Sequence, residues 1–463
     1  MANQRLKNLT DHKKIIVLIF ILALFLRLFF LFTEPQDMWH DASFTYLFSK
    51  EPVSFILDSN DVHPSLYYIL MKGFLLISDN EQFLRCTSIL FFSCFFWALY
   101  FFLRRNLDWK TGIITLFMVS VSITMIHYSL EIRNYMLGMF FVVMQLYYFF
   151  EYIYWKRPKQ AWLFILFSIL MLYTHYYTMF VLGVEAIYII WKLKDRIMDF
   201  TTIGMWITFF SVPLVIHLIR TLPKMQSMWF NDITLLSFFS TFTYQLMLPE
   251  TITSWHLVFF IFFTGLVFYY FYKTKPEPFY YMFFLIPVGM LWLISQLSPL
   301  YHHRFFLFYA PALYIIIAST ISYYWERNKH LGLVLYLIFG LLFAYSSGMY
   351  DKATTTELHD SQLVLKNYLD PNLEYTFIHR SPFSFTPYSY YFRDWNVHNM
   401  LDTNLNKIER FTAGGSVIKD YQIIINKNLI NCYDGCYYIH ENWLPIPEDS
   451  TFIFNEGGLV VHG

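Results

Sequence analysis

Long apolar runs separated by short polar turns fill most of the chain between residues 15 and 349. A run of about 17 to 25 apolar residues can cross the hydrocarbon core of a bilayer as a helix. We predict eleven spans, of which the sixth is the shortest: 15–33, 83–103, 111–127, 134–154, 161–177, 178–191, 199–219, 255–272, 278–297, 305–324 and 331–349. The pattern therefore predicts a polytopic α-helical membrane protein.

Two other segments are predicted to lie outside the spans. The apolar segment 64–78 is too short to cross a bilayer comfortably, and Pro64 suits the first turn of a helix. We therefore expect an interfacial or re-entrant helix there. The stretch 220–254 is expected to be an external loop that forms an amphipathic surface segment.

Basic residues cluster on only one side of the predicted spans. The clusters are Arg5, Lys7, Lys13 and Lys14; Arg104, Arg105 and Lys110; Lys156, Arg157 and Lys159; Lys192, Lys194 and Arg196; Lys273 and Lys275; and Arg327 and Lys329. The positive-inside rule makes that side cytoplasmic. The sequence therefore predicts a multi-pass protein of the plasma membrane with a cytoplasmic N-terminus. An odd number of spans then places the C-terminal residues outside the cytoplasm.

Composition agrees with a membrane protein and excludes some partners. Hydrophobic residues make up 57% of the 463 residues and charged residues 14%, with a mean hydropathy of +0.41. Soluble domains contain roughly 25% charged residues. The formal net charge is zero, so no nucleic-acid partner is expected. The first apolar run has no small-residue cleavage site and is expected to remain as a span.

The composition changes at Tyr350, where charged and polar residues return and the apolar runs stop. We predict a helix at 357–369 and short strands at 375–379, 421–426 and 451–454. Alternating helices and strands are typical of a small α/β domain. The predicted organisation is a transmembrane domain, 1–349, with its first external loop at 34–82, followed by an extracytoplasmic α/β domain, 350–463.

Cysteine usage leaves one question open. Cys432 and Cys436 lie close together in the polar C-terminal part, where a disulfide is permitted if that part is outside the cytoplasm. The sequence does not decide whether they are bonded. They have no metal-ligating partners at a recognisable spacing.

The first external loop gathers ionisable residues between apolar runs: His40, Asp41, Asp61 and His63. Ionisable residues set among membrane spans are costly and are candidates for function. The other predicted external turns add Glu131 and Arg133, then His175, then Arg220 and Lys224, and finally His302, His303 and Arg304, while Arg85 opens the second span. We expect these span ends to converge on one pocket at the outer membrane face.

Such a pocket suits transfer of a group from a lipid phosphate. Arginine holds phosphate oxygens bidentately and stabilises the charge that builds on a leaving phosphate. A carboxylate such as Asp41 takes the proton of the acceptor. Structural alternatives remain open: arginines that snorkel at span ends, Asp41 as a helix N-cap, His175 as an interface residue, and Glu131 and Arg133 each paired with another residue in the core, since two positions apart they do not face each other on a helix.

Several motifs, taken in order, resemble the GT-C membrane glycosyltransferases and most closely glycosyltransferase family 39. They are Trp39-His40-Asp41-Ala42, Asp61-Val62-His63-Pro64-Ser65-Leu66-Tyr67-Tyr68, Glu81 to Arg85, Glu131-Ile132-Arg133-Asn134-Tyr135, Thr174-His175-Tyr176, and Arg304 before Pro311. The matches span roughly residues 15–320. That family includes protein O-mannosyltransferases and lipid A aminoarabinose transferases.

The resemblance implies an inverting hexosyl- or pentosyltransferase that takes a sugar from a polyprenyl-phosphate donor and passes it to a lipid, glycan or protein acceptor. It implies catalysis by Asp41 and His40, and donor or substrate binding by Asp61, His63, Arg85, Glu131, Arg133, Tyr135, His175 and Arg304. No cofactor or metal is expected, although some relatives bind a divalent metal, which stays an alternative.

Two departures from the family pattern matter for catalysis. The acidic pair of the family is His40-Asp41 here, with the histidine at the usually catalytic position, and Ser65 replaces a proline. Three alternatives follow: Asp41 is the base, His40 acts with it, or the protein is an inactive relative. A transporter or flippase of lipid-linked sugars is a further alternative, although the sequence shows no internal repeat of the transporter kind.

Overall fold

The structure is a computed structural model of all 463 residues. The residues it describes are 12–33, 38–59, 61–226, 233–247, 254–298, 300–335, 375–379, 382–394, 397–401, 436–441, 452–456 and 459–462. The chain forms two compact units. The first contains residues 1–32, 85–219 and 229–352, and the second contains 33–84, 220–228 and 353–463.

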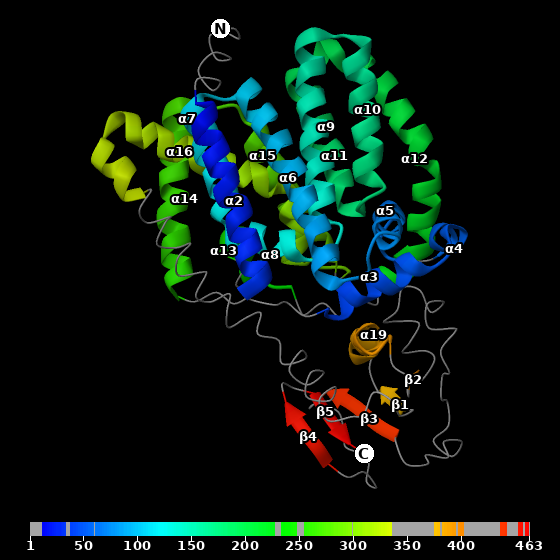
Figure 1. Cartoon of the computed structure of the whole chain (residues 1–463). Coiled ribbons are helices and arrows are strands. Elements are labelled where there is room, and N and C mark those ends of the chain that lie inside the picture. The colour runs from blue at the N-terminus through cyan, green and yellow to red at the C-terminus, as the bar shows by residue number, and fades with distance from the viewer. Residues whose placement is uncertain are drawn as a thin grey trace. The chain divides into compact units, whose positions relative to one another are not determined.

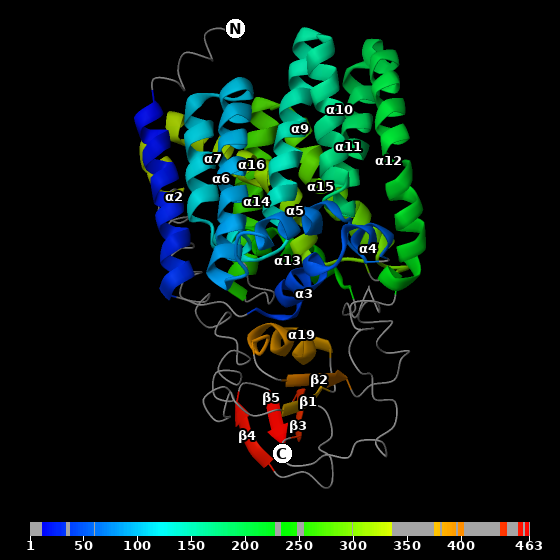
Figure 2. The ribbon, with the colours of Figure 1, turned by 45° about the vertical axis from the view of Figure 1, so that its right-hand side comes forward.

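The first unit is built from helices, most of which run in the same general direction in both views (Figure 1, Figure 2). They are α2 (Lys13–Thr33), α6 (Glu81–Asn106), α7 (Trp109–Val121), α8 (Ile123–Leu130), α9 (Tyr135–Trp155), α10 (Pro158–Leu172), α11 (Met179–Lys192), α12 (Ile197–Gln226), α13 (Leu235–Met247), α14 (Ser254–Thr274), α15 (Phe279–Ile294) and α16 (Ala310–Arg327), with the 3-10 helices η1 (Tyr176–Thr178), η2 (Lys194–Arg196) and η3 (His303–Tyr309). The division between the units falls within α6, before Arg85, and within α12, after Ile219.

Within the described residues, five helical segments are long and apolar enough to cross a membrane. They are Lys13–Thr33, Glu81–Asn106, Tyr135–Trp155, Lys194–Leu222 and His303–Arg327, and the bent pair α7–α8 makes a sixth if it is counted as one span. Each of these segments contains an apolar stretch of 18 residues. In α2 and in Lys194–Leu222, which is mostly α12, only 28% and 22% of that stretch is buried, whereas in His303–Arg327 it is 94%. Therefore α16 lies in the centre of the helix bundle, and α2 and α12 lie at its periphery.

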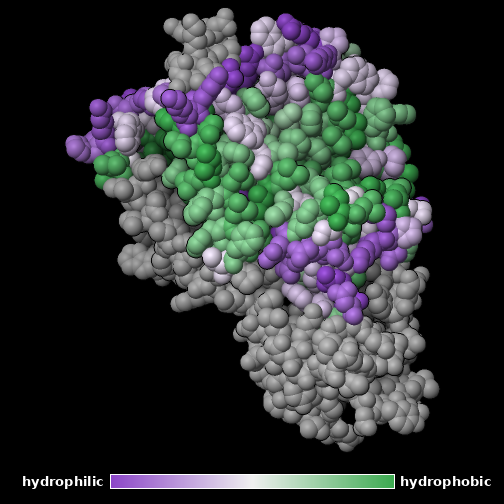
Figure 3. Space-filling model, viewed as in Figure 1, coloured by the Kyte–Doolittle hydropathy of each residue, from purple (hydrophilic) through white to green (hydrophobic). Residues whose placement is uncertain are grey.

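The peripheral helices carry large exposed apolar side chains. Leu18 and Phe25 on α2 are 64% and 60% exposed, and Phe209 on α12 is 65% exposed. Figure 3 shows a hydrophobic band across the helices, with hydrophilic residues at the edge where α7 begins and α9 ends. Exposed apolar surface of this extent requires a lipid environment. The protein is membrane-embedded, as the sequence predicts.

The expectation of eleven spans stays a prediction. The predicted runs 161–177, 178–191 and 278–297 form the shorter helices α10, α11 and α15, and most of the run 331–349 lies outside the described residues. The segment 64–78 forms α5 (Leu66–Leu75), a helix of 10 residues, which is too short to cross a bilayer.

The predicted span at 111–127 is divided between two helices, because α7 and α8 meet at a bend of 56°. Ser122 lies between them, and its hydroxyl accepts a hydrogen bond from the backbone N–H of Met125 as the N-cap of α8. The Tyr314 hydroxyl on α16 donates to the same Ser122 oxygen at 2.7 Å. A local cap and a contact from a distant helix therefore lie at the break in this run.

The stretch 220–254 also differs from its prediction as a surface segment. It contains α13, on which Thr241, Tyr244 and Gln245 are buried. The Thr241 hydroxyl contacts the hydroxyl of Tyr301 at 2.5 Å and Nδ1 of His303 at 2.9 Å. These partners lie far along the sequence, which explains why the local pattern does not show the burial.

The second unit joins the first loop to C-terminal residues. Its helices are α3 (His40–Lys50), α4 (Val53–Asp58), α5 and α19 (Pro382–Tyr391). The described strands β1 (Tyr375–His379), β2 (Val397–Leu401), β3 (Cys436–Glu441), β4 (Phe452–Glu456) and β5 (Leu459–His462) form one sheet in the order β2-β1-β3-β5-β4. β1 is parallel to β2 and β3, and β5 is antiparallel to β3 and β4.

Two of the predicted C-terminal strands are described. The strand at 375–379 is confirmed as β1, and the strand at 451–454 overlaps β4. The predicted helix 357–369, the predicted strand 421–426, the boundary at 349/350 and the Cys432–Cys436 question lie wholly or partly outside the described residues. The division into 1–349 and 350–463 therefore stays a prediction.

Candidate functional site

In the first unit, side-chain hydrogen bonds link the start of α6 to the turn that follows α8. The Nη1 atom of Arg85 donates to the backbone carbonyl of Leu130 at 2.9 Å. One turn further along α6, the hydroxyl of Ser88 donates to the carbonyl of Glu131 at 2.5 Å. Both partner carbonyls lie at the C-terminal end of α8, where a helix leaves its carbonyls without intrahelical donors. Arg85 is 3% exposed.

The same turn is linked onward to the turn between α10 and α11. The Nδ2 atom of Asn134 donates to the carbonyl of Thr174 at 2.7 Å. From there, the Tyr177 hydroxyl donates to the carbonyl of Leu300, and the Tyr309 hydroxyl donates to the carbonyl of Tyr177. These bonds bring together three turns that are far apart in the sequence. Convergence of all the external turns on one pocket stays a prediction.

His175 lies at the centre of the joined turns and is 1% exposed. Its Nδ1 atom accepts a hydrogen bond from the backbone N–H of Tyr177 at 3.2 Å. Its ring centroid is 4.8 Å from that of Phe308 and 6.1 Å from that of Tyr135. Burial, followed by the positive charges of Arg133 and Arg304, lowers the pKa of His175 to about 3. The ring is therefore neutral at neutral pH and supplies hydrogen-bonding atoms rather than charge.

Arg133 and Arg304 provide the positive charge near His175. Arg133 is 4% exposed and Arg304 is half-buried. Buried guanidinium groups are costly unless anionic or polar partners satisfy them. An arrangement of arginines around a neutral imidazole is suited to an anion with several oxygen atoms, such as a phosphate.

Glu131 is also buried in this turn, at 5% exposure. Its Oε1 atom lies 3.5 Å from Nε2 of His127 on α8, and its backbone N–H donates to the carbonyl of His127 as the helix ends. The contact with His127 favours the structural alternative for Glu131. A role in substrate binding stays a prediction.

In the second unit, His40 and Asp41 form the first turn of α3. Trp39 is the N-cap, and the N-cap makes no side-chain hydrogen bond. Asp41 is therefore inside the helix rather than its N-cap, and that structural alternative is wrong. A carboxylate in the first turn is stabilised by the helix dipole. His40 and Asp41 are both half-buried, so part of the surface of each residue is accessible.

Asp61 fixes the turn that leads into α5. It is 2% exposed, its Oδ2 atom accepts from the Tyr68 hydroxyl at 2.6 Å, and its Oδ1 atom accepts from the backbone N–H of Val62 at 2.8 Å. These bonds give Asp61 a structural role in the loop. His63 follows in the same turn and is half-buried.

The structure thus places the predicted site residues in two groups. One group lies in the first unit: Arg85, Glu131, Arg133, Tyr135, His175 and Arg304. The other lies in the second unit: His40, Asp41, Asp61 and His63. Among the described residues, no cluster of three or more His, Cys, Asp or Glu side chains is arranged to hold a metal ion. Metal dependence was not decided by the sequence and stays a prediction.

Three residues that link the turns were not predicted: Asn134, Tyr177 and Tyr309. Each lies within or beside a predicted motif, but its partner is a backbone carbonyl on another turn. Every residue type has a backbone carbonyl, so the residue type of the acceptor does not indicate that it accepts such a bond. Only the position of Asn134 between Arg133 and Tyr135 offers a signal in the sequence.

The chain resembles known proteins in part of its sequence and in its fold. Residues 61–219, less than half of the chain, match the family model of dolichyl-phosphate-mannose-protein mannosyltransferase. No curated protein matches the chain in sequence. Among solved structures, ArnT from Cupriavidus metallidurans in the apo state is 11% identical, with a TM-score of 0.61 and 98% of each chain covered.

Two further solved structures show the same likeness. ArnT from Cupriavidus metallidurans bound to undecaprenyl phosphate is 10% identical, with a TM-score of 0.63 and coverage of 96% of this chain and 97% of that one. The oligosaccharyltransferase AglB from Archaeoglobus fulgidus, in complex with an inhibitory peptide and a dolichol-phosphate, is 11% identical, with a TM-score of 0.53 and coverage of 93% and 69%. The chain has the GT-C fold.

The resemblance to GT-C glycosyltransferases of the family 39 type is therefore confirmed by the family model and by the fold. The matched segment 61–219 includes Asp61, His63, Arg85, Glu131, Arg133, Tyr135 and His175. His40, Asp41 and Arg304 lie outside it. Their assignment to the site of this GT-C protein rests on the motifs in the sequence and, for Arg304, also on its charge near His175.

Proposed function

We propose that this GT-C protein is a glycosyltransferase that moves a sugar from a polyprenyl-phosphate donor to an acceptor at the outer face of the membrane. The observation that carries the proposal is the group formed by buried Arg133, half-buried Arg304 and neutral His175, at turns that hydrogen bonds join. Cations beside a buried, neutral imidazole make a site for an anionic group.

The lipid-linked donor is proposed from the chemistry of that site and from the structural relatives. ArnT binds undecaprenyl phosphate and AglB binds a dolichol-phosphate in the solved structures. A polyprenyl tail in the bilayer would leave its phosphate at the span ends, where Arg85, Arg133 and Arg304 lie. The acceptor is a lipid, a glycan or a protein segment, and the donor sugar is a hexose or pentose.

The proposed reaction is a single displacement with inversion at the anomeric carbon. Asp41 accepts the proton of the acceptor hydroxyl or amine while that atom forms its bond to the anomeric carbon. The bond from the anomeric carbon to the phosphate oxygen breaks, and its electron pair remains on the phosphate. The arginines stabilise the charge on the leaving phosphate, and His175 contributes hydrogen bonding. No metal takes part in this proposal.

The proposed topology follows the positive-inside rule. Eleven spans place the N-terminus in the cytoplasm, and the first loop and the C-terminal α/β domain outside it. The described sheet β2-β1-β3-β5-β4 with α19 supports an α/β character for the C-terminal part.

Transfer from defined donors tests this function. Purified protein is supplied with polyprenyl-phosphate sugars and candidate acceptors, and the glycosylated product is followed for wild type and Asp41→Asn. We expect Asp41→Asn to lower kcat about 10²–10⁴-fold, the usual range for a general base. A variant with the wild-type rate would show that Asp41 is not the base. Movement of intact sugar-lipid across vesicles without transfer would support the transporter alternative instead.

A further inference from the structure

A single hydroxyl from the C-terminal part of the chain bonds to both ends of the first loop. The Tyr391 hydroxyl, at the last residue of α19, accepts a hydrogen bond from the backbone N–H of Met38 at 3.0 Å. It lies 3.3 Å from Oε2 of Glu81, to which it donates. Met38 precedes the first turn of α3 by two residues and is fully buried, and Glu81 opens α6. All of these residues belong to the second compact unit.

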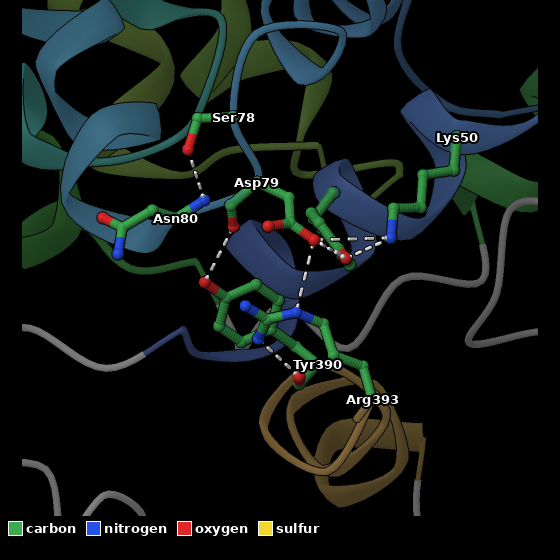
Figure 4. Close-up of polar contacts among 7 residues, drawn as sticks. Lys50, Ser78, Asp79, Asn80, Tyr390 and Arg393 are labelled. Atoms are coloured by element: carbon green, nitrogen blue, oxygen red, sulfur yellow. Dashed lines mark hydrogen bonds and ion pairs between the residues drawn. The ribbon is translucent and has the colours of Figure 1, made fainter. Parts of the chain in front are cut away.

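The same C-terminal segment holds the loop at a second point, around Asp79 (Figure 4). The Oδ2 atom of Asp79 accepts from the Tyr46 hydroxyl at 3.2 Å and lies 3.4 Å from Nε of Arg393. The Tyr390 hydroxyl donates to the backbone carbonyl of Asp79 at 3.2 Å. Tyr46 is on α3, so one carboxylate links the loop helix to the residues around the end of α19.

Aromatic packing and charge reinforce this second point. The rings of Tyr46 and Tyr390 meet edge to face with centroids 4.8 Å apart. Burial lowers the pKa of Arg393, but Tyr390, Tyr46 and Asp79 outweigh it and raise that pKa overall. Lys50 lies 3.9 Å from the same carboxylate, yet burial lowers its pKa in spite of Asp79. At 3.4 Å against 3.9 Å, Arg393 is the closer ionic partner of Asp79.

We propose that α19 and the residues after it are a positioning element for the first loop, with Tyr391 as its principal residue. The inference rests on the proposed function, because the loop carries His40 and Asp41 in the first turn of α3. Tyr391 fixes the chain just before that turn, and the Asp79 contacts fix the C-terminal half of the same helix. Held at both ends, α3 presents its first turn in one orientation, which a transfer reaction requires of its base.

Tyr391→Phe tests the inference, because it removes only the hydroxyl. We expect amide hydrogen exchange of residues 38–50 to become about tenfold faster, since a buried N–H and a carboxylate lose their shared partner. We expect kcat to fall about tenfold while KM for the lipid donor stays unchanged. Tyr272→Phe, on α14, is the matched control, since Tyr272 is 69% exposed and should leave both measurements unchanged.

Arg393→Gln gives a second, milder test that leaves Tyr391 in place. Because the Arg393 side chain is 26% exposed, we expect only about a threefold faster exchange in residues 38–50. If Tyr391→Phe fails to fold, the exchange rates of Arg393→Gln test the positioning role in its place. Unchanged exchange in residues 38–50 in the folded variants would overturn the inference.

Hydrogen exchange also distinguishes a failure of this inference from a failure of the proposed function. If Asp41→Asn keeps the wild-type rate while Tyr391→Phe accelerates exchange, the loop is positioned as inferred but the base is misassigned. If Asp41→Asn abolishes transfer while Tyr391→Phe changes neither exchange nor kcat, the proposed base stands and the positioning role is wrong.

Discussion

At the scale of single residues, Arg304 is the clearest test of the anion site. Arg304 lies close enough to His175 for its charge to lower the pKa of the imidazole, and charged hydrogen bonds contribute about 1.5–3 kcal/mol each. We expect Arg304→Gln to raise KM for the polyprenyl-phosphate donor at least tenfold. Arg304→Lys should recover part of the loss, because lysine keeps the charge but not the bidentate geometry.

Arg157→Gln is the matched control for Arg304→Gln. Arg157 follows α9, whereas Arg133 precedes it, so Arg157 lies at the opposite end of that helix from the site. Its substitution should leave donor KM at the wild-type value. Equal KM values for Arg304→Gln and wild type, measured over a range of donor concentrations, would remove Arg304 from the proposed phosphate site.

His175 predicts a dependence of stability on pH. Its pKa is about 3 in the folded protein because of burial, Arg133 and Arg304, against an unfolded value of about 6.5. Between these values the unfolded state binds more protons, so folding stability is complete above pH 6.5 and falls as the pH falls. The slope is at most about 1.4 kcal/mol for each pH unit. Thermal unfolding between pH 7 and pH 5 should therefore be less pH-dependent in His175→Asn than in wild type, and equal slopes would contradict the assignment.

At the scale of elements, Arg27 explains how the peripheral helix α2 is held. Arg27 is fully buried, and its Nη1 and Nη2 atoms donate to the carbonyls of Ser120 at 3.0 Å and Val119 at 3.4 Å, in the last turn of α7. Its guanidinium lies 3.3 Å from the ring centroid of Phe92 on α6. The last carbonyls of a helix lack intrahelical donors, and the apolar interior of a membrane protein offers no water to replace them.

We expect Arg27→Met to destabilise the protein by about 1–3 kcal/mol, since it leaves buried carbonyls without a donor. The measurement is the unfolding midpoint in detergent. Lys13→Met is the control, because Lys13 lies exposed at the start of the same helix. Similar midpoints for Arg27→Met and Lys13→Met would show that the contacts to α7 contribute nothing measurable.

Element by element, the sequence predicts helices well and their interruptions poorly. Long apolar runs fix helices such as α6, α9 and α16 within a few residues of the predicted spans. The break at Ser122 depends on Tyr314, and the burial of α13 depends on Tyr301 and His303. These partners come from other parts of the chain, so no local pattern contains them.

At the scale of the whole molecule, the same limit applies to the candidate site. The sequence predicts which residue types gather at the turns, and the structure brings Arg85, Glu131, Arg133 and His175 together within one unit. The sequence does not predict that α19 holds the first loop through Tyr391, because that contact joins residues more than 300 positions apart. Local motifs indicate the candidate site residues, and long-range hydrogen bonds determine where those residues lie.

The orientation of the protein in the membrane determines on which side the proposed reaction occurs. The basic clusters at Arg104–Lys110 and Lys156–Lys159 should face the cytoplasm, and the residues after α19 should lie outside it. Single cysteines at Lys159 and at Asp394, introduced in place of the exposed native residues, are labelled in intact cells with a membrane-impermeant maleimide. The four native cysteines, Cys86, Cys94, Cys432 and Cys436, are first replaced by Ala. We expect labelling at 394 in intact cells and at 159 only after the membrane is opened. The reverse pattern would place the site in the cytoplasm and would contradict a donor used at the outer face.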